Sequence, residues 1–215
     1  MMITHHVSDE TLLTCASGKL AAGPSVVVRA HCDMCSECRE RLSDLEAVGG
    51  ALLVCLSATT MSEDALARAL ARLDADKPDL PSKRGADVPS TGTAYPRSLA
   101  RHRIGRFRWL APGFRRSRVA LNSGAEANVF LMRIGAGRMM PEHGHSEREY
   151  TLVLSGSFRD ELGHYGAGDF IELDSSVEHQ PKVDLDGECV CLAALEGEMR
   201  LNGFFGRLIQ RILPL

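Results

Sequence analysis

The chain has 215 residues and an ordinary composition, 44% hydrophobic and 25% charged, so its length suits one large domain or two small ones. Its net charge of −3 argues against direct nucleic-acid binding, and no apolar run approaches the length of a membrane span or of a signal-peptide core. We therefore expect a cytoplasmic protein, in which the seven cysteines are reduced thiols or metal ligands rather than a disulfide framework.

The first third of the chain has the pattern of a helical region. Ser8 can cap a helix whose first turn carries two acidic residues, and Leu residues then recur at helical spacing. The further expected helices cover residues 24–32, 36–48 and 62–75. Gly49 and Gly50 are expected to end the third of them.

Residues 76–96 have the composition of a linker, with four prolines and little apolar content. After them the chain becomes β-like: VFLMRI, YTLVLSGSF, DFIEL and CVCLAAL are short apolar runs separated by Gly, Asp and Ser. Such strands favour a barrel or jelly roll over a parallel sheet. Residues 1–75 hold 6 Lys and Arg against 10 Asp and Glu, a net −4, whereas the remainder is close to neutral. This division favours two domains.

A first candidate metal site lies in the stretch HCDMCSEC. His31, Cys35 and Cys38 are spaced four and three residues apart, which places them on one helical face or on a helix end and the following turn. Zinc prefers thiolate and imidazole ligands in a tetrahedral arrangement, so these three leave one position to fill.

The neighbouring residues leave several possibilities open for this site. His5 or His6 can supply the fourth ligand, whereas Cys32 lies one residue off the shared face. Without a metal, the pattern would be an exposed polar turn with a buried free cysteine. A thiol switch that expels zinc on oxidation is a further alternative, since Cys15 and Cys32 are spare thiols.

A second candidate metal site lies in the stretch HGHSERE. His143 and His145 are two residues apart, so both point to the same face of a strand, and Glu149 shares their parity. We expect these three in one hairpin, completed by His179 after the DFIEL strand. Imidazoles with one carboxylate suit Zn, Fe, Mn, Ni or Cu. An open coordination position would allow catalysis, and a closed one a structural or sensory role; surface His and Glu in a charged turn is the simplest alternative.

Two stretches could suggest other functions. Residues 97–118 contain eight Arg and no acid, which could form a nucleic-acid patch, but alternation at 103–109 favours a strand with one solvated face. The tail LNGFFGRLIQRILPL is amphipathic at helical spacing and could lie on a membrane. We expect it to dock on the protein's own barrel instead.

Residues 137–156 read G-x5-H-x-H-x3-E-x6-G, which resembles the first metal motif of the cupin family. The second cupin motif, G-x5-P-x-G-x2-H-x3-N, is only partly kept: His179 is in place, but Asp174, Ser176 and Val183 replace the Pro, Gly and Asn. The resemblance implies a jelly-roll barrel holding a divalent metal. Zinc is the expected ion, with iron, manganese and nickel as alternatives.

The stretch HHVSDETLLTCASGKL, followed by HCDMCSECRERLSDLEAVGG, looks like a zinc-binding anti-sigma domain. Its combination with a cupin resembles ChrR-type anti-sigma factors over nearly the whole chain. The resemblance implies a zinc ion held by His6, His31, Cys35 and Cys38, with His6 indicated by its place in HHVSD. It also implies an extracytoplasmic-function sigma factor as partner, released when reactive oxygen acts through the cupin half.

We therefore interpret the chain as an all-α zinc-bound helical domain (1–75), a linker (76–96) and an all-β cupin jelly-roll barrel with a C-terminal tail (97–215). It is expected to sequester a sigma factor from core RNA polymerase through an apolar helical stripe and to have no catalytic residues. The barrel metal, or oxidisable Met139 or Met140 beside it, would detect the signal. The alternative is a dioxygenase-like cupin metalloenzyme whose helical half oligomerises.

Overall fold

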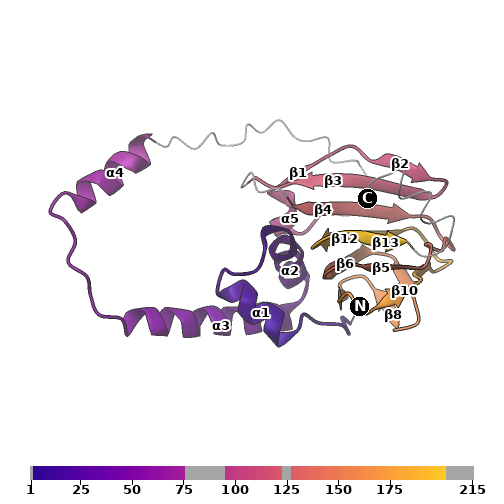
Figure 1. The fold of residues 1–215 in the computed structure, drawn as a ribbon, viewed down its shortest axis with the longest axis horizontal. Helices are drawn as coiled ribbons and strands as arrows, with labels where there is room; N and C mark the ends of the chain where they lie inside the picture. Colours follow the sequence, from indigo (N-terminus) through magenta and orange to yellow (C-terminus); the bar gives the residue numbers. More distant parts are fainter. Residues whose placement is uncertain (1, 76–94, 123–126, 202–215) are drawn as a thin grey trace.

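The computed structural model describes residues 2–75, 95–122 and 127–201, which form an N-terminal helical region and an antiparallel β domain (Figure 1). The helices of this part are α1 (Asp9–Ala16), α2 (Ala22–Met34), α3 (Ser36–Val54), α4 (Ala65–Ala75) and the short α5 (Arg97–Ala100). The expected order of a helical region first and an all-β domain second is confirmed. Most of the predicted linker and the whole amphipathic tail from residue 202 lie outside the described residues.

The helix boundaries follow local chemistry, with one departure from expectation. The Ser8 side chain accepts a hydrogen bond from the Thr11 N–H and so caps α1, as predicted. Pro24 is the third residue of α2, where its missing N–H costs nothing because the first turn has no intrahelical acceptors. The predicted end of the third helix is wrong: α3 runs through Gly49 and Gly50, because two glycines weaken a helix by only about 1 kcal/mol each.

The β domain consists of one large sheet and two small ones. Its strands are β1 (Arg103–Ile104), β2 (Arg108–Ala111), β3 (Phe114–Ala120), β4 (Asn128–Ile134), β5 (His143–His145), β6 (Glu149–Ser155), β7 (Ser157–Arg159), β8 (His164–Gly166), β9 (Phe170–Leu173), β10 (Glu178–His179), β11 (Lys182–Val183), β12 (Cys189–Leu195) and β13 (Met199–Leu201). The large sheet has the order β1-β3-β4-β12-β6-β9, with β2 on β3, and the small sheets have the orders β10-β5-β13 and β11-β7-β8. The arginine-rich stretch forms α5 and β1 to β3, but the single strand expected over residues 103–109 is divided into β1 and β2, and neighbouring Arg108 and Trp109 are both exposed.

Both faces of the large sheet are buried along its central strands β4, β6 and β12, which explains why these strands read as continuous apolar runs. On β6 and β12, Leu152, Leu154 and Leu192 face the helices, and they belong to the same core cluster as the apolar side of α2. The alternate residues Val153 and Cys191 face the barrel interior and pack with the small sheets. The helical region and the barrel therefore share one apolar layer.

Helix α2 lies directly on the outer face of this sheet, in contact with β6 and β12 (Figure 1). Its residues Val27 and Val28 are fully buried there. At Gly23 the helix comes so close that a Cβ would lie 3.1 Å from Val129 Cγ2 and 3.3 Å from Ala127 Cβ. The contact between α2 and the large sheet, which we call the seam, is thus a packed interface. Among the described helices, none combines the length and the apolar composition that crossing a membrane requires.

The seam predicts a position-specific cost of a side chain at Gly23. Because Gly23→Val would force α2 away from β4, we expect it to lower the free energy of unfolding by about 1–3 kcal/mol. Gly50→Val is the control, since a Cβ there has nothing within 4 Å, and its effect should stay within about 0.5 kcal/mol. Urea unfolding of both variants measures this, and equal losses would contradict tight packing at the seam.

Candidate metal centres

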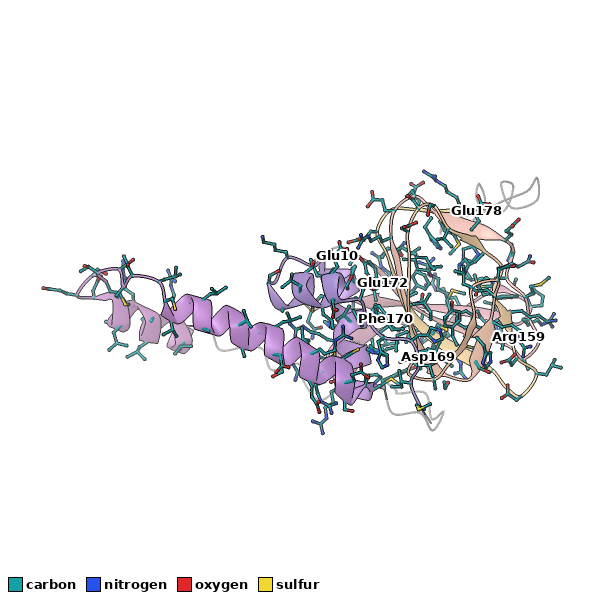
Figure 2. All side chains as sticks on the ribbon, turned by 90° about the horizontal axis from the view of Figure 1, so that it is seen from below. Glu10, Arg159, Asp169, Phe170, Glu172 and Glu178 are labelled. Carbon is teal, nitrogen blue, oxygen red and sulfur yellow. The ribbon has the colours of Figure 1, made fainter. Side chains whose placement is uncertain are left out.

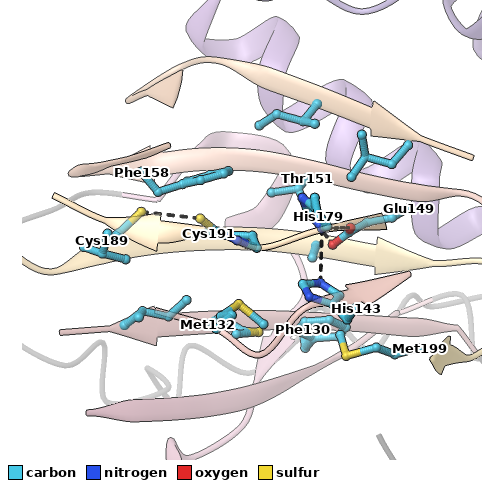
Figure 3. A pocket seen from close by; sticks show the side chains of 17 residues that line it. Phe130, Met132, His143, Glu149, Thr151, Phe158, His179, Cys189, Cys191 and Met199 are labelled. Atoms are coloured by element: carbon cyan, nitrogen blue, oxygen red, sulfur yellow. Dashed lines mark hydrogen bonds and ion pairs between the residues drawn. The ribbon is translucent and has the colours of Figure 1, made fainter. Parts of the chain in front are cut away.

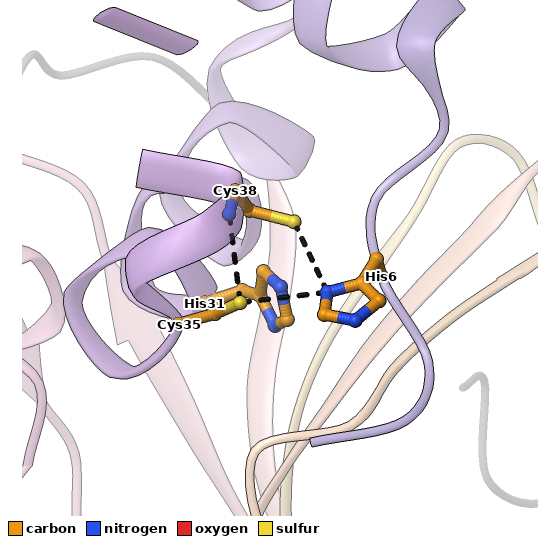
Figure 4. A group of neighbouring side chains, drawn as sticks. All are labelled: His6, His31, Cys35 and Cys38. Atoms are coloured by element: carbon orange, nitrogen blue, oxygen red, sulfur yellow. Dashed lines mark hydrogen bonds between the residues drawn. The ribbon is translucent and has the colours of Figure 1, made fainter. Parts of the chain in front are cut away.

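The first group of potential ligands joins the N-terminal segment to the junction of α2 and α3 (Figure 4). The ligand atoms of His6, His31, Cys35 and Cys38 all lie within 4.8 Å of one another, and all but His6 are buried. His6 Nδ1 is 3.4 Å from Cys35 Sγ and 3.5 Å from Cys38 Sγ. Cys35 caps α3 and Cys38 sits in its first turn, where the helix dipole favours negatively charged groups. Two thiols and two imidazoles are a ligand set that zinc prefers.

The hydrogen bonds around this group leave the ring atoms that face it free for a cation. His31 Nδ1 donates to the Gly168 carbonyl at 2.9 Å, so the lone pair is on Nε2. That buried Nε2 has no hydrogen-bond partner in the described part of the chain. His6 uses Nδ1 toward the sulfurs, while its Nε2 lies 3.5 Å from a carboxylate oxygen of Glu37. An unpartnered buried nitrogen beside two thiols fits a bound zinc ion.

Burial controls the protonation of this group. It lowers the pKa of His31 to about 4, so the imidazole is neutral and able to ligate at physiological pH. Burial raises the pKa of the Cys38 thiol to about 11, so this sulfur is protonated at neutral pH until a metal displaces the proton. Cys32, which lies outside the group, has its pKa raised to about 12 by burial and has the properties of a core residue.

The second group lies inside the barrel. The ligand atoms of His143, His145, Glu149 and His179 are within 4.8 Å of one another and all four residues are buried. His143 Nε2 and His179 Nε2 face each other at 3.1 Å, and His145 Nε2 lies 2.8 Å from Glu149 Oε2. His145 Nδ1 has no hydrogen-bond partner within the described residues. Three converging imidazoles with one carboxylate fit a divalent metal.

The surroundings of this group again fix which nitrogens face inward. His143 Nδ1 donates to the Pro141 carbonyl, and His179 Nδ1 donates to Asp160 Oδ2, both at 2.9 Å. Both rings therefore present an unprotonated Nε2 to the centre of the group. Burial lowers the pKa of His143 to about 4. Burial alone would raise the pKa of Glu149, but the neighbouring His145 outweighs it and lowers the value to about 2, so the carboxylate is charged.

A cavity of about 50 Å³ adjoins the barrel group, enough for water or a small ligand (Figure 3). Its walls are apolar and rich in sulfur: they include Met132, Met140, Cys189, Cys191 and Met199. Cys189 Sγ and Cys191 Sγ are 3.6 Å apart. Of the two methionines noted in the sequence, Met140 lines this cavity, while the Met139 side chain is half-exposed.

The sequence nominated all eight residues that the structure brings into the two groups. The expected single hairpin for the barrel group is wrong, because β5, with both histidines, pairs with β10 and β13, whereas β6, with Glu149, belongs to the large sheet. Sequence reasoning also missed Asp160 and the Cys189 and Cys191 pair. A C-x-C alternation on a strand was the available signal for the pair, but no local pattern marks Asp160.

Comparisons with known proteins agree with this architecture. A family model described as the ChrR cupin-like domain matches residues 100–197. The anti-sigma-E factor ChrR of Cereibacter sphaeroides is 38% identical over 213 residues, which cover 98% of each chain. A crystal structure of Rhodobacter sphaeroides SigE in complex with the anti-sigma ChrR matches with a TM-score of 0.74 and 35% identity, covering 91% of this chain and all of that one.

The protonation of the helical group predicts a pH dependence of zinc binding. Because the Cys38 thiol must lose its proton to bind, apparent zinc affinity should fall as pH falls, by about tenfold per pH unit for each proton displaced. His31, with a pKa of about 4, should add no proton competition above pH 5. Zinc competition with a chelator between pH 8 and 6 measures this; a flat profile would contradict thiolate ligation.

The Asp160 hydrogen bond predicts a second effect, confined to the barrel. Asp160→Asn should lower the metal affinity of the barrel group by about 10–100-fold, since the carboxylate orients His179. Asp186→Asn, which alters an exposed carboxylate on another turn, is the matched control. Metal content after dialysis against graded chelator distinguishes them, and equal retention in both variants would contradict the orienting role.

Proposed function

This chain belongs to the ChrR family of anti-sigma factors, and we propose on that basis that it sequesters an extracytoplasmic-function sigma factor from core RNA polymerase. The observation that carries the proposal is the similarity along almost the whole chain, helices and barrel together, to a protein solved in complex with its sigma factor. The proposal includes zinc at the helical group, a divalent metal in the barrel, and no catalytic turnover.

The helical region offers a surface suited to such a partner. Large apolar side chains remain exposed along the second half of α3, the following turn and α4: Val48, Leu52, Leu53, Val54, Leu56, Met61, Leu66, Leu70 and Leu73. We name this set the apolar stripe. Exposed apolar patches of this extent mark interaction sites. Leu66, Leu70 and Leu73 share one face of α4, which suits helix-in-groove binding, and the net −4 of residues 1–75 complements a basic DNA-binding protein.

Zinc supports this surface by linking elements that are short on their own. The helical group ties the N-terminal segment to the end of α2 and the start of α3. Metal binding of this kind contributes folding free energy directly. Zinc binding would fix the direction in which α3 extends from the helical region (Figure 1), and the exposed residues of the apolar stripe continue along that helix.

The barrel would act as the sensor of reactive oxygen. Its cavity places oxidisable sulfur beside the metal group. The hydrogen bond with Cys189, together with burial, raises the pKa of Cys191, so this thiol stays protonated and reacts slowly with peroxides. The methionines of the cavity wall need no deprotonation: a hydroperoxide entering the cavity would oxidise one of them to its sulfoxide, leaving an alcohol. The added polar oxygen would disturb the apolar wall beside the metal group.

A transcription assay with the full chain tests the proposal. Purified protein is added to an extracytoplasmic-function sigma factor from the same genome and core polymerase, with and without zinc chelator. Leu70→Glu should weaken sigma binding by about 30-fold or more, the effect of losing one interface hot spot of about 2 kcal/mol. Ala71→Glu makes the same charge change away from the leucine face of α4 and should bind normally.

One outcome would contradict the role of α4, and another would contradict the proposal as a whole. Equal binding by both variants would remove α4 from the interface. Failure to inhibit any such sigma factor of the genome would leave the dioxygenase-like metalloenzyme with an oligomerising helical half as the better hypothesis, for which the barrel cavity would be the substrate site. Metal-dependent oxygen uptake with a small organic substrate would then support that alternative.

A further inference from the structure

The N-terminal segment that carries His6 is held in place by the barrel rather than by the helices alone. It runs along the outer edge of β9, the last strand of the large sheet, and the Phe170 N–H donates to the His5 carbonyl at 3.0 Å. Further along, the Ser8 N–H and the Thr11 hydroxyl donate to the carboxylate of Glu172 on the same strand. Figure 2 shows Asp169, Phe170 and Glu172 on the side of the barrel that faces the helices.

Asp169 is the centre of this attachment. The residue is only 4% exposed, and Oδ1 accepts the N–H groups of Thr4 at 2.7 Å and His5 at 2.9 Å, while Oδ2 accepts the Gly166 N–H at 2.8 Å. Burial alone would raise the pKa of Asp169, but these N–H donors lower it, so the group is a carboxylate. A buried carboxylate that binds two successive N–H groups fixes the backbone immediately before His6.

The same barrel turn orients a second residue of the helical group. The Gly168 carbonyl accepts the hydrogen bond that fixes the His31 ring, and the Phe170 ring lies 5.4 Å from it. Gly168 has a φ of +95°, and a Cβ there would lie 2.6 Å from Ile3 Cγ1, so the turn also fits closely against the N-terminal segment. Two of the four potential zinc ligands, His6 and His31, therefore depend on residues 166–170 for their placement.

The opposite edge of β9 contacts the strand that carries a barrel ligand. Strand β9 pairs with β6, with Leu173 opposite Glu149 and Phe170 opposite Leu152. Between the two potential metal groups there is thus one strand: its outer edge holds the segment of His6, and its inner edge pairs with the strand of Glu149. A shift of β6 or β9 would reach the helical group without crossing any other element.

We propose that Asp169 is a positioning residue for the helical zinc site, through which the state of the barrel metal site controls how tightly zinc is held. This inference rests on the proposed zinc and barrel-metal sites, but not on sigma binding. In this inference the barrel acts directly on the helical group. A change around Glu149 moves β9, which weakens the hydrogen bonds of Asp169 with residues 4 and 5. His6 then leaves the site.

Cobalt binding to the full-length protein tests the positioning role. Thiolate ligands give Co²⁺ a sulfur-to-metal charge-transfer absorption that histidine and carboxylate ligands do not, and Cys38→Ser identifies which absorption belongs to the helical site. Asp169→Asn should raise the cobalt dissociation constant of that site by about 10–100-fold. Asp174→Asn, which alters an exposed carboxylate that accepts from Ser176 just beyond β9, should leave it unchanged.

Glycine variants independently test the contact between the barrel turn at Gly168 and the N-terminal segment. Gly168→Ala places a methyl group against Ile3 and should weaken cobalt binding in the same direction as Asp169→Asn. Gly113→Ala is its control, because Gly113 has a similar φ of +86° but its Cβ would meet only the side chain of Arg138. Unchanged cobalt affinity in Asp169→Asn would overturn the positioning role, as would equal losses in the control variants. A wild-type protein without thiolate–cobalt absorption would overturn this inference and the zinc site together.

A double-mutant cycle with Glu149→Gln tests the coupling. If the barrel site acts through Asp169, Glu149→Gln alone should alter cobalt affinity at the helical site, and the double variant should behave like Asp169→Asn alone. Additive effects, or no effect of Glu149→Gln on the helical site, would overturn the coupling. Because no sigma factor is present in these assays, failure of the sequestration proposal would leave their outcome unaffected.

Discussion

The large sheet has no solvent-facing side across its central strands, and the rest of the molecule is arranged around this constraint. Small sheets cover one face and enclose the barrel group, while α2 covers the other and brings the helical group to the sheet edge. The apolar layer beneath α2 is worth about 25 cal/mol for each Å² removed from water, so separating helices from barrel would expose a costly surface. The two halves are distinct in sequence but share a core.

Each potential metal group gathers polar atoms where burial makes them expensive unless they have a partner. At the helical group the lone pair of His31 and two sulfurs converge, and in the barrel three imidazoles and a charged carboxylate do so. Burial lowers the pKa of His31 and of His143, so protonation does not satisfy these rings at neutral pH. A cation at each group would give these buried nitrogens, sulfurs and carboxylate oxygens a partner. It would also cross-link elements that are far apart in sequence.

Much of the fold and of the two groups could be predicted from the sequence because the signals are local. Helical spacing puts Cys35 and Cys38 together, and strand parity puts His143 and His145 on one side. The end of α3 was misplaced because a glycine pair stops a helix only when the chain turns there, and neither residue adopts a positive φ. The sequence could not predict the roles of Asp160, Asp169 and the Gly168 carbonyl, since each binds a histidine that only the tertiary fold brings near.

Part of the protein's apolar surface is buried in its own core, and another part is exposed and available to a partner. Most of the apolar side of α2 is buried against the barrel and the neighbouring helices, so it is not available to a partner while the seam is closed. The apolar stripe on α3 and α4 is exposed in the same state. A partner that binds the apolar stripe would therefore not require the halves to separate. The proposed coupling would not require separation either, since β9 holds the N-terminal segment that carries His6, and His6 lies in one group with Cys35 and Cys38 at the start of α3.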